Sequence, residues 1–498
     1  MASKKSSSSN KKVAKRIVKA TTKAIKKNKN ISIPIIVSLF LVLVISLIVL
    51  HSLKIIDLSN FLTFFKSNET TTVVTSQPTT TFNHTGDGDY NDGAIASYSS
   101  NIELCDDGYV ENVIYENFQI HFMENGSHKT GDSTYIKAGD IDILIDAGST
   151  QGSATTLESY INNFCTDGIL EYVIVTHAHS DHWAGMFGNS KSNQKDFFNE
   201  TVGYTGILYY YRVGTLIDFS LTNKTEEDKA NSNTEYYKYT KAVEYAVSNG
   251  TINYKAHECF DNINGASSHY VLSEEYDISF DIVYNYYYYN NSSDENNYSV
   301  CTMFNYGDYH FLLTGDLEKE GEEKMAEYYD GSTPFKTLPH VELFKAGHHG
   351  SQTSSNNCLL EKITPSICCV CCCAGSTEYT PNLVNIFPTQ AFIDRIKNYT
   401  DRVYVTTLLD EDLTRSTNEW VFKSLNGNIC VSSNGNYIGL YGSNNLVKLK
   451  DTEWFNEEVY VISTSSGYNV APSKSSKAYY DSLTAGAILR PRRTWIIE

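Results

Sequence analysis

The sequence predicts an α/β fold in which two stacked β-sheets are flanked by helices. From about residue 101, short apolar runs bounded by turn residues alternate with helical patterns. This rhythm fits two packed sheets with helices on their outer faces. The composition, 41% hydrophobic and 13% aromatic, is that of a folded protein, and 498 residues leave room for two or three domains.

The elements of this fold are expected along residues 101–441, the predicted main domain. VIYENFQIHFM and TYIKAGDIDILIDAG look like paired strands, SATTLESYINNFC has a helical pattern, and the next strand ends at Val175. Residues 226–248 look like a surface helix in an insertion, and YNYYYYNNSSDENNY looks like a loop or a strand edge. Five later strands are expected at SVCTMFNYG, YHFLLTG, VELFKAG, ICCVCCCAG and VYVTTLL. Residues 442–498 look like an additional strand unit or a partially ordered tail, and the sequence does not indicate their role.

The N-terminal 53 residues differ from the rest of the chain. Residues 1–30 carry eleven Lys or Arg and no acid, and residues 31–50 carry no charge at all. An apolar run of about 20 residues matches a hydrocarbon core of about 30 Å, whereas a cleaved signal peptide, the alternative, has an apolar region of only about 7–15 residues. The sequence therefore favours a retained transmembrane helix over residues 31–53, in contact with the lipid bilayer.

The charges on either side of this span predict its orientation. The basic residues precede it, so the positive-inside rule leaves residues 1–30 in the cytoplasm and places everything downstream outside the cell. The stretch SNETTTVVTSQPTTTFNHTGDGDYNDGAIASYSS indicates that residues 54–100 are a flexible linker. We therefore expect a single-pass protein of the cell membrane with an extracellular main domain.

The cysteines do not suggest a disulfide framework. Five of the eleven fall in CCVCCC, residues 368–373, which reads as a buried strand in which cysteine acts as a small apolar residue. A soft-metal cluster is the alternative, but CxxC pairs at zinc-site spacing are absent from the sequence. The odd total also means that not every thiol can pair within the chain.

Three histidines and an aspartate follow directly on the strand that ends at Val175. In THAHSDH, His177 and His179 can point to one side of an extended segment, while Asp181 and His182 reach the other side of the same pocket. Neutral imidazole and carboxylate are the natural ligands of zinc and similar divalent ions. The alternative, a merely solvated loop, does not explain this concentration, so one loop is predicted to serve two metals.

Two later segments repeat the pattern of an apolar strand, a glycine and then a ligand type. LLTGD places Asp316 after one strand, and KAGHHGS places His348 and His349 after another. The motif H-x-H-x-D-H resembles the metallo-β-lactamase superfamily, and LLTGD together with GHHGSQTSS resembles the hydrolase domain of ComEC-type competence proteins and its stand-alone relatives. Further matches at residues 131–148, 297–316 and 425–435 extend the resemblance over about residues 115–440.

The resemblance implies an αββα four-layer sandwich, the metallo-β-lactamase fold, and two divalent metal ions, zinc or alternatively manganese. The ligand roles that it implies are these: His177 and His179 for the first metal, Asp181 and His182 for the second, Asp316 as the bridge, and His348 or His349, with His348 preferred, as the last ligand. Asp146 would orient the histidine loop; by itself it would read as a turn residue before glycine.

The sequence departs from the family pattern at two points. A further lone histidine often binds the first metal, and only His257 and His269 are placed to supply it. A Tyr-Gly-His-Pro element usually follows the strand after HHGS, whereas this chain has Tyr379 and Pro381 without a histidine. The role of that histidine must be filled in another way or not at all.

The expected reaction is hydrolysis by a metal-bridging hydroxide, with Asp181 and Asp316 holding the metals and orienting the nucleophile. The Ser351 hydroxyl can bind a phosphate or an oxyanion, although it can equally cap its loop. The branch resemblance implies a phosphodiesterase or nuclease. The alternatives are an amide or lactone hydrolase of the β-lactam type and a non-catalytic surface module.

The net charge of the chain limits the classes of substrate that we expect. The formal charge is −18, so the chain after its basic first 30 residues carries −29 (−18 less 11). Proteins that track nucleic acid show a basic stripe, and no extended basic surface of this kind is evident in the sequence. Because metal ions can draw in one phosphate locally, a nucleotide-sized or single-ended phosphodiester remains compatible with this charge.

Overall fold

The computed structural model describes residues 108–126, 129–411, 414, 420–465, 467–471, 481 and 486–497. The predicted basic segment (1–30), transmembrane helix (31–53) and linker (54–100) lie outside these residues. Within the described part of the chain, no helix has the length and apolar character needed to cross a membrane.

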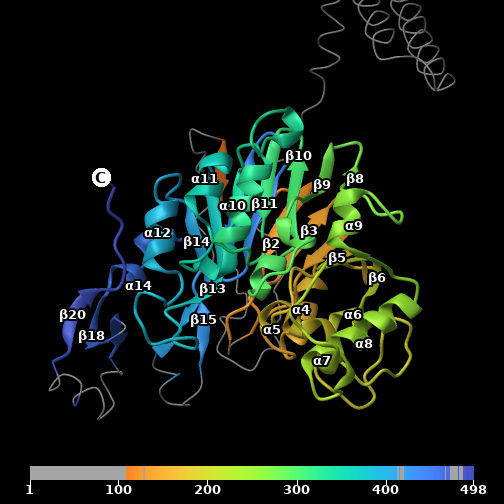
Figure 1. Cartoon of the computed structure of the whole chain (residues 1–498), viewed down its shortest axis with the longest axis horizontal. Helices are drawn as coiled ribbons and strands as arrows, with labels where there is room; N and C mark the ends of the chain where they lie inside the picture. Colours follow the sequence, from red (N-terminus) through yellow and green to blue (C-terminus); the bar gives the residue numbers. More distant parts are fainter. Residues whose placement is uncertain are drawn as a thin grey trace, which may run out of the picture. The chain divides into compact units, whose positions relative to one another are not determined.

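Two large mixed β-sheets form the centre of the described chain (Figure 1). The first sheet has the strand order β1 (Tyr109–Glu111), β17 (Ile438–Gly442), β16 (Ile429–Ser433), β2 (Phe118–Phe122), β3 (Thr134–Ala138), β4 (Ile141–Ile145), β5 (Ile169–Ile174), β6 (Arg212–Asp218) and β7 (Ile252–Lys255). The second has the order β15 (Phe422–Ser424), β14 (Val403–Leu409), β13 (Ile367–Ala374), β12 (Leu343–Lys345), β11 (Tyr309–Leu313), β10 (Cys301–Tyr306), β9 (Ile278–Val283) and β8 (His269–Ser273). The predicted strands are thus confirmed.

The two sheets pack face to face through alternate side chains of their strands. Phe118 of β2 contacts Phe304 of β10, with ring centroids 6.3 Å apart, and Phe311 of β11, with centroids 5.1 Å apart. Because side chains alternate across a strand, the neighbouring His121 points to the opposite face, where its ring lies 5.8 Å from that of Tyr160. One face of the first sheet is therefore buried against the second sheet, and the other is buried against helices.

Helices complete the two outer layers. On the side of the first sheet lie α4 (Ser153–Ile161), α5 (Ser180–Phe187), α6 (Ile207–Tyr210), α7 (Glu226–Ala230) and α8 (Glu235–Ser248). Helix α9 (Ala256–Asp261) contacts β6 and β7 of the first sheet and β9 of the second. On the side of the second lie α10 (Lys319–Tyr328), α11 (Asn357–Ile363) and α12 (Gln390–Ile396), whose buried Met325, Leu360 and Phe392 cluster with Phe344 and Val370 of the sheet. The order helix, sheet, sheet, helix confirms the predicted sandwich.

One local prediction differs from the structure. The single helix expected over 226–248 is two helices, because the Thr234 side chain accepts a hydrogen bond from the Tyr237 N–H and starts α8 anew. Of the two expectations for the tyrosine-rich run, the structure shows the loop, which contains two short 3₁₀ turns, η1 (Tyr286–Tyr288) and η2 (Glu295–Tyr298). In contrast, CCVCCC is a fully buried part of β13, as predicted.

The C-terminal residues form a third, smaller sheet. Its strand order is β19 (Gly467–Val470), β18 (Glu458–Thr464) and β20 (Ile488–Pro491). Two short helical elements precede this sheet, η5 (Leu449–Asp451) and α14 (Glu453–Asn456), and two others lie in the main domain, η3 (Pro334–Lys336) and η4 (Gly347–Gly350). Of the two expectations for residues 442–498, the strand unit is the one that the structure shows.

Candidate metal centre

The ligand-type side chains lie beyond the carboxyl ends of parallel strands in both sheets. Strands β4 and β5 pair in parallel in the first sheet, and Asp146 and His177 follow them. Strands β11 and β12 pair in parallel in the second sheet, and Asp316 and the turn η4 follow them. Parallel strands end at a common edge, which is where open α/β sheets bind ligands. Stacking the sheets brings the two edges together.

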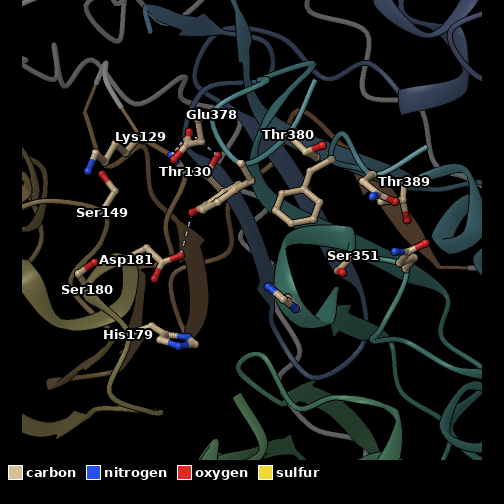
Figure 2. A pocket seen from close by; sticks show the side chains of 15 residues that line it. Lys129, Thr130, Ser149, His179, Ser180, Asp181, Ser351, Glu378, Thr380 and Thr389 are labelled. Carbon is tan, nitrogen blue, oxygen red and sulfur yellow. Dashed lines mark hydrogen bonds between the residues drawn. The ribbon is translucent and has the colours of Figure 1, made fainter. Parts of the chain in front are cut away.

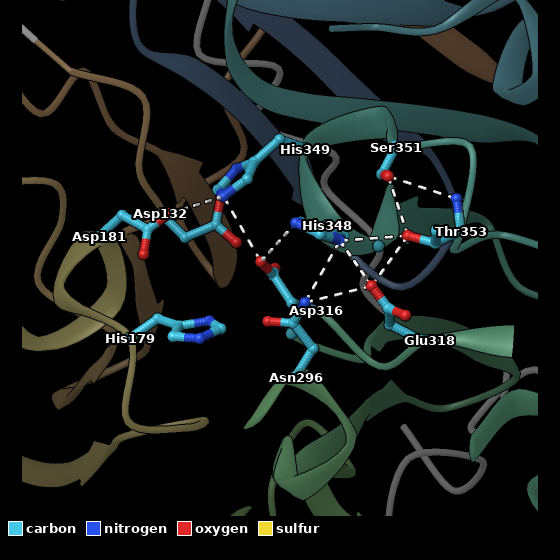
Figure 3. A network of polar contacts seen from close by, with 12 residues as sticks. Asp132, His179, Asp181, Asn296, Asp316, Glu318, His348, His349, Ser351 and Thr353 are labelled. Atoms are coloured by element: carbon cyan, nitrogen blue, oxygen red, sulfur yellow. Dashed lines mark hydrogen bonds and ion pairs between the residues drawn. The ribbon is translucent and has the colours of Figure 1, made fainter. Parts of the chain in front are cut away.

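Two clusters of ligand atoms combine residues that follow strands of both sheets, and they share His182. In each cluster the nitrogen and oxygen atoms all lie within 4.8 Å of one another, a spacing at which one ion can bind them together. The first cluster consists of His177, His182 and Asp316, and the second of Asp181, His182 and His349. Side chains more than 160 positions apart in the sequence, such as Asp181 and His349, therefore lie close together (Figure 3).

Hydrogen bonds orient two of these histidines. The His182 Nδ1 atom lies 2.8 Å from an Asp146 carboxylate oxygen, which leaves its Nε2 atom 3.1 Å from Asp316. Thr176 donates its N–H and its hydroxyl to Asp146, so its oxygen accepts from His177 Nδ1, at 3.1 Å. Partners on Nδ1 fix the tautomer and direct Nε2 toward a metal. Asp146 thus bonds both Thr176 and His182 at the start of the histidine loop.

The atoms around His349 fit a divalent ion better than they fit one another. His349 Nε2 lies 3.4 Å from Asp181 Oδ2 and 3.5 Å from Asp316 Oδ2. Two ligands of one tetrahedral zinc ion, with bonds of about 2.0–2.1 Å, are separated by roughly 3.3 Å. Within the described residues, His349 Nε2 and Asp316 Oδ1 are also buried without a hydrogen-bond partner. Such groups are costly unless an additional partner binds them.

Charge also favours a cation here. Asp132, Asp146 and Asp316 are buried carboxylates in one small region, and Asp181 lies beside them. Burial opposes the charged imidazolium of His349, but the carboxylates of Asp316 and Asp132 outweigh it and raise the pKa of that side chain to about 10. A field that holds a proton so strongly also attracts a divalent ion, which replaces the proton when it binds.

The two adjacent histidines of GHHGS occupy different environments. His349 is 1% exposed, and its Nδ1 donates to the Cys371 carbonyl at 2.7 Å. His348 has a side chain that is 23% exposed, its Nδ1 lies 3.2 Å from Glu318, and its Nε2 is 4.0 Å from Asp316. Whereas the sequence argument preferred His348 as the last ligand, the geometry favours His349.

This difference predicts unequal effects of two matched substitutions. Both residues have a positive φ, 48° for His348 and 55° for His349, and asparagine tolerates this left-handed conformation. We expect His349→Asn to weaken zinc binding by more than about 100-fold and His348→Asn by about 10-fold or less, since even the loss of a residue that orients a ligand costs about 10–100-fold. Competition with a chelating dye measures both affinities. Equal losses would place His348 in the metal cage as well.

The other predicted site residues lie at the rim of the clusters. His179 Nδ1 is 3.0 Å from His177 Nε2, close enough for both to bind one ion, although His179 falls outside the two clusters. Ser351 accepts from the Thr353 N–H at 3.3 Å, which is the loop-capping interaction, and also lines the pocket described below. His257 bonds Ser220, and His269 pairs with Asp281, so neither supplies the additional histidine.

Two charged residues of the site were not singled out from the sequence. Asp132 and Lys345 form an ion pair, and their side chains are only 2% and 4% exposed. Asp132 Oδ1 also lies 3.3 Å from His349 Nδ1, and Lys345 Nζ lies 4.0 Å from Asp316. The available signal was a lysine within the apolar strand VELFKAG, since lysine is almost never fully buried without a partner.

A pocket of about 520 Å³ opens over the clusters (Figure 2). Its lining is mostly hydroxyl, amide and aromatic, with one lysine: Lys129, Thr130, Ser149, His179, Ser180, Asp181, His348, Ser351, Gln352, Glu378, Tyr379, Thr380, Asn385, Phe387 and Thr389. The Tyr379 hydroxyl donates to Asp181 at 3.1 Å. A small polar substrate can therefore reach the candidate ligands from this side.

A known protein family matches the segment that carries the histidine loop. The model described as "Metallo-beta-lactamase superfamily" matches residues 128–188. This segment contains Asp132, Asp146 and His182, which the structure brings together as a candidate metal-binding group. This segment is similar to the metallo-β-lactamase superfamily. The buried His/Asp clusters fit metal binding of the kind that is typical of this fold.

Similarity to individual members of the metallo-β-lactamase superfamily is local or weak. Recombination protein 2 of Haemophilus influenzae is 27% identical over 114 residues, which are 23% of this chain and 12% of that protein. ComE operon protein 3 of Bacillus subtilis is 32% identical over 73 residues, 14% of this chain and 8% of that protein. The chain is thus distantly homologous to these competence proteins and spans about a tenth of their length. Among solved structures, this chain is similar to the metallo-beta-lactamase fold protein YhfI from Bacillus subtilis, with 10% identity and a TM-score of 0.30. The similarity covers 58% of this chain and 95% of YhfI. At this TM-score it adds nothing to the assignment.

Proposed function

We propose that this protein is a membrane-anchored, externally facing phosphodiesterase that acts with two divalent metal ions, zinc or manganese. The observation that carries the proposal is the pair of ligand clusters that share His182, with His349 Nε2 between two carboxylates. Two such ions, when bound, supply an activated water and clamp the attacking and leaving oxygens of a displacement. The side chains of the protein would bind the ions, orient the nucleophile and bind the substrate.

The side chains divide this work by position. His177 and His179 would hold one ion, Asp181, His182 and His349 the other, and Asp316 lies within reach of both sets; Asp181 and Asp316 would also orient the nucleophile. The Tyr379 hydroxyl donates its one proton to Asp181, so its oxygen is left to accept a hydrogen bond from the substrate. Ser351, on the opposite wall, offers a second hydroxyl to a phosphate.

The lining of the pocket supports a small phosphodiester as the substrate. Hydroxyl and amide groups satisfy phosphate and sugar oxygens, and Lys129 is the one lysine among the lining residues. A long nucleic acid needs many phosphate contacts from Lys and Arg, which neither this lining nor the charge of −29 beyond residue 30 favours. The distant homology to the competence proteins supports a nucleotide-like group on the phosphate.

The location at the membrane rests on the sequence alone. The uncharged run at residues 31–50 has the length of a bilayer span, and the basic residues before it favour a cytoplasmic N-terminus. The catalytic domain would then act outside the cell on substrates that reach the surface.

The test uses the full chain in detergent, loaded with zinc or manganese. We expect turnover of bis-p-nitrophenyl phosphate and of a dinucleotide that disappears with chelator and returns when the metal is restored. Single-stranded DNA tests for longer substrates and nitrocefin for amide hydrolysis. Nitrocefin turnover alone would overturn the phosphodiesterase proposal in favour of a β-lactam-type hydrolase, and silence on all substrates with both ions bound would indicate a surface module without catalytic activity.

A further inference from the structure

The wall of the pocket opposite the histidine loop is a single long connection. Residues 375–389, hereafter the pocket loop, join β13 to α12 and contribute six lining residues: Glu378, Tyr379, Thr380, Asn385, Phe387 and Thr389. The ring of Phe387 lies 5.7 Å from that of His348 and 5.9 Å from that of His349. The position of this loop therefore determines the shape of the pocket directly over the candidate metal ligands.

A buried arginine from the C-terminus binds the back of the pocket loop. The Arg493 guanidinium is 4% exposed and donates to main-chain carbonyl groups. Three of these belong to the pocket loop: Leu383 at 3.2 Å, Ile386 and Pro388 at 2.8 Å. A guanidinium presents five N–H donors in a rigid fork, so one side chain holds three separate points of the loop in a defined curve.

The edge of the C-terminal sheet extends onto the same loop. The Leu383 N–H donates to the Tyr468 carbonyl at 2.8 Å, and the Val470 N–H donates to the Pro381 carbonyl at 2.9 Å. Asn382 forms an antiparallel bridge with Asn469 between them. The pocket loop thus acts as a fourth, short strand of this sheet, and unpaired strand edges favour such additions.

Further contacts fix the C-terminal unit to the main domain. Arg492 pairs with Glu457 at 2.7 Å and with Glu411 at 3.0 Å. The Gln390 side chain, at the start of α12, both donates to the Thr494 carbonyl at 2.8 Å and accepts from the Thr494 N–H at 2.9 Å. The pocket loop is consequently bonded to the C-terminal residues along its back while its front faces the candidate metal centre.

We infer that the C-terminal unit is part of the catalytic apparatus: residues 458–465, 467–470 and 486–494 form a clamp that positions the pocket loop, with Arg493 as its main positioning residue. Through this clamp the aromatic wall of Tyr379 and Phe387 is held at the right distance from the metal ligands to receive the organic group of the substrate. The catalytic consequence rests on the proposed phosphodiesterase function, whereas the positioning of the loop does not.

The test compares Arg493→Met with Arg402→Met in the full chain. Arg402 is the control, because its guanidinium lies over the Tyr109 ring, outside both the pocket loop and the C-terminal unit. We expect R493M to speed hydrogen–deuterium exchange in residues 376–389 and to raise KM for the dinucleotide about tenfold, with zinc content unchanged, since small misplacements of a substrate-positioning group have effects of this size or larger. R493K is expected to restore only part of the protection, because an ammonium group cannot span three carbonyls.

The exchange measurement separates this inference from the proposed function. Unchanged exchange in residues 376–389 of R493M would overturn the clamp, whether or not the enzyme is a phosphodiesterase. Faster exchange without any phosphodiester turnover in the unmodified chain would retain the clamp and reject the proposed substrate. If R493M does not fold, Gln390→Leu, a change at a partly buried residue that removes both bonds to Thr494, is expected to speed exchange at the end of the pocket loop. Unchanged exchange there would equally overturn the clamp.

Discussion

Asp316→Asn is expected to abolish metal-dependent hydrolysis and to prevent the two ions from binding together. The Asp316 carboxylate lies 3.1 Å from His182 Nε2 and 3.5 Å from His349 Nε2, so it faces both clusters. Loss of a residue that merely orients a ligand lowers metal affinity or activity about 10–100-fold. Loss of the shared Asp316 carboxylate should therefore lower both metal affinity and activity more than about 100-fold. Asparagine keeps the size of the side chain, so the change isolates the charge.

Metal content and turnover measure this effect on the same preparation. Asp277→Asn is the matched control, because Asp277 is an exposed residue at the turn before β9 with a φ of 55°, which asparagine accepts. The control should bind metal and turn over as the unmodified chain does. If Asp316→Asn retained two ions per chain, Asp316 would not lie between them, and the proposed arrangement would be wrong.

Lys345→Met is expected to have the largest effect on stability. The Lys345 ammonium and the Asp132 carboxylate are almost fully buried together. Removing one partner of a buried ion pair leaves the other charge without compensation, which typically costs about 3–5 kcal/mol. Methionine keeps the length and apolar stem of lysine, so the loss reflects the charge and not a cavity. Urea unfolding of the metal-free protein measures it.

The double variant Asp132→Asn/Lys345→Met provides the internal control. When both charges are removed, no isolated buried charge remains, so we expect the double variant to be more stable than Lys345→Met alone. Such a non-additive result is the signature of direct coupling between two side chains. Strict additivity of the two single effects would mean that the ion pair contributes nothing as a pair and that each residue acts through other contacts.

The strands and the histidine loop were predictable because their signals are local. Val173, Ile174 and Val175 form an apolar run too short for a helix of normal length, and His177 follows directly. The motif carries its own chemistry, since imidazole and carboxylate at this spacing have few other uses. The start of a separate helix, α8, after Thr234 depends by contrast on a single capping hydrogen bond. The spacing of apolar residues does not reveal such a bond.

The sequence by itself determined the two-sheet fold, the histidine loop and the residue types available for a metal, because alternation and ligand spacing act over a few neighbouring positions. Only the tertiary structure decided that His349 and not His348 faces the carboxylates, that Lys345 and Asp132 form a buried pair behind them, and that Arg493 binds the pocket loop. These three facts depend on distances between segments up to about two hundred positions apart. Such distances arise only when the two sheets stack and the C-terminal strands pair, and no local pattern in the chain encodes them.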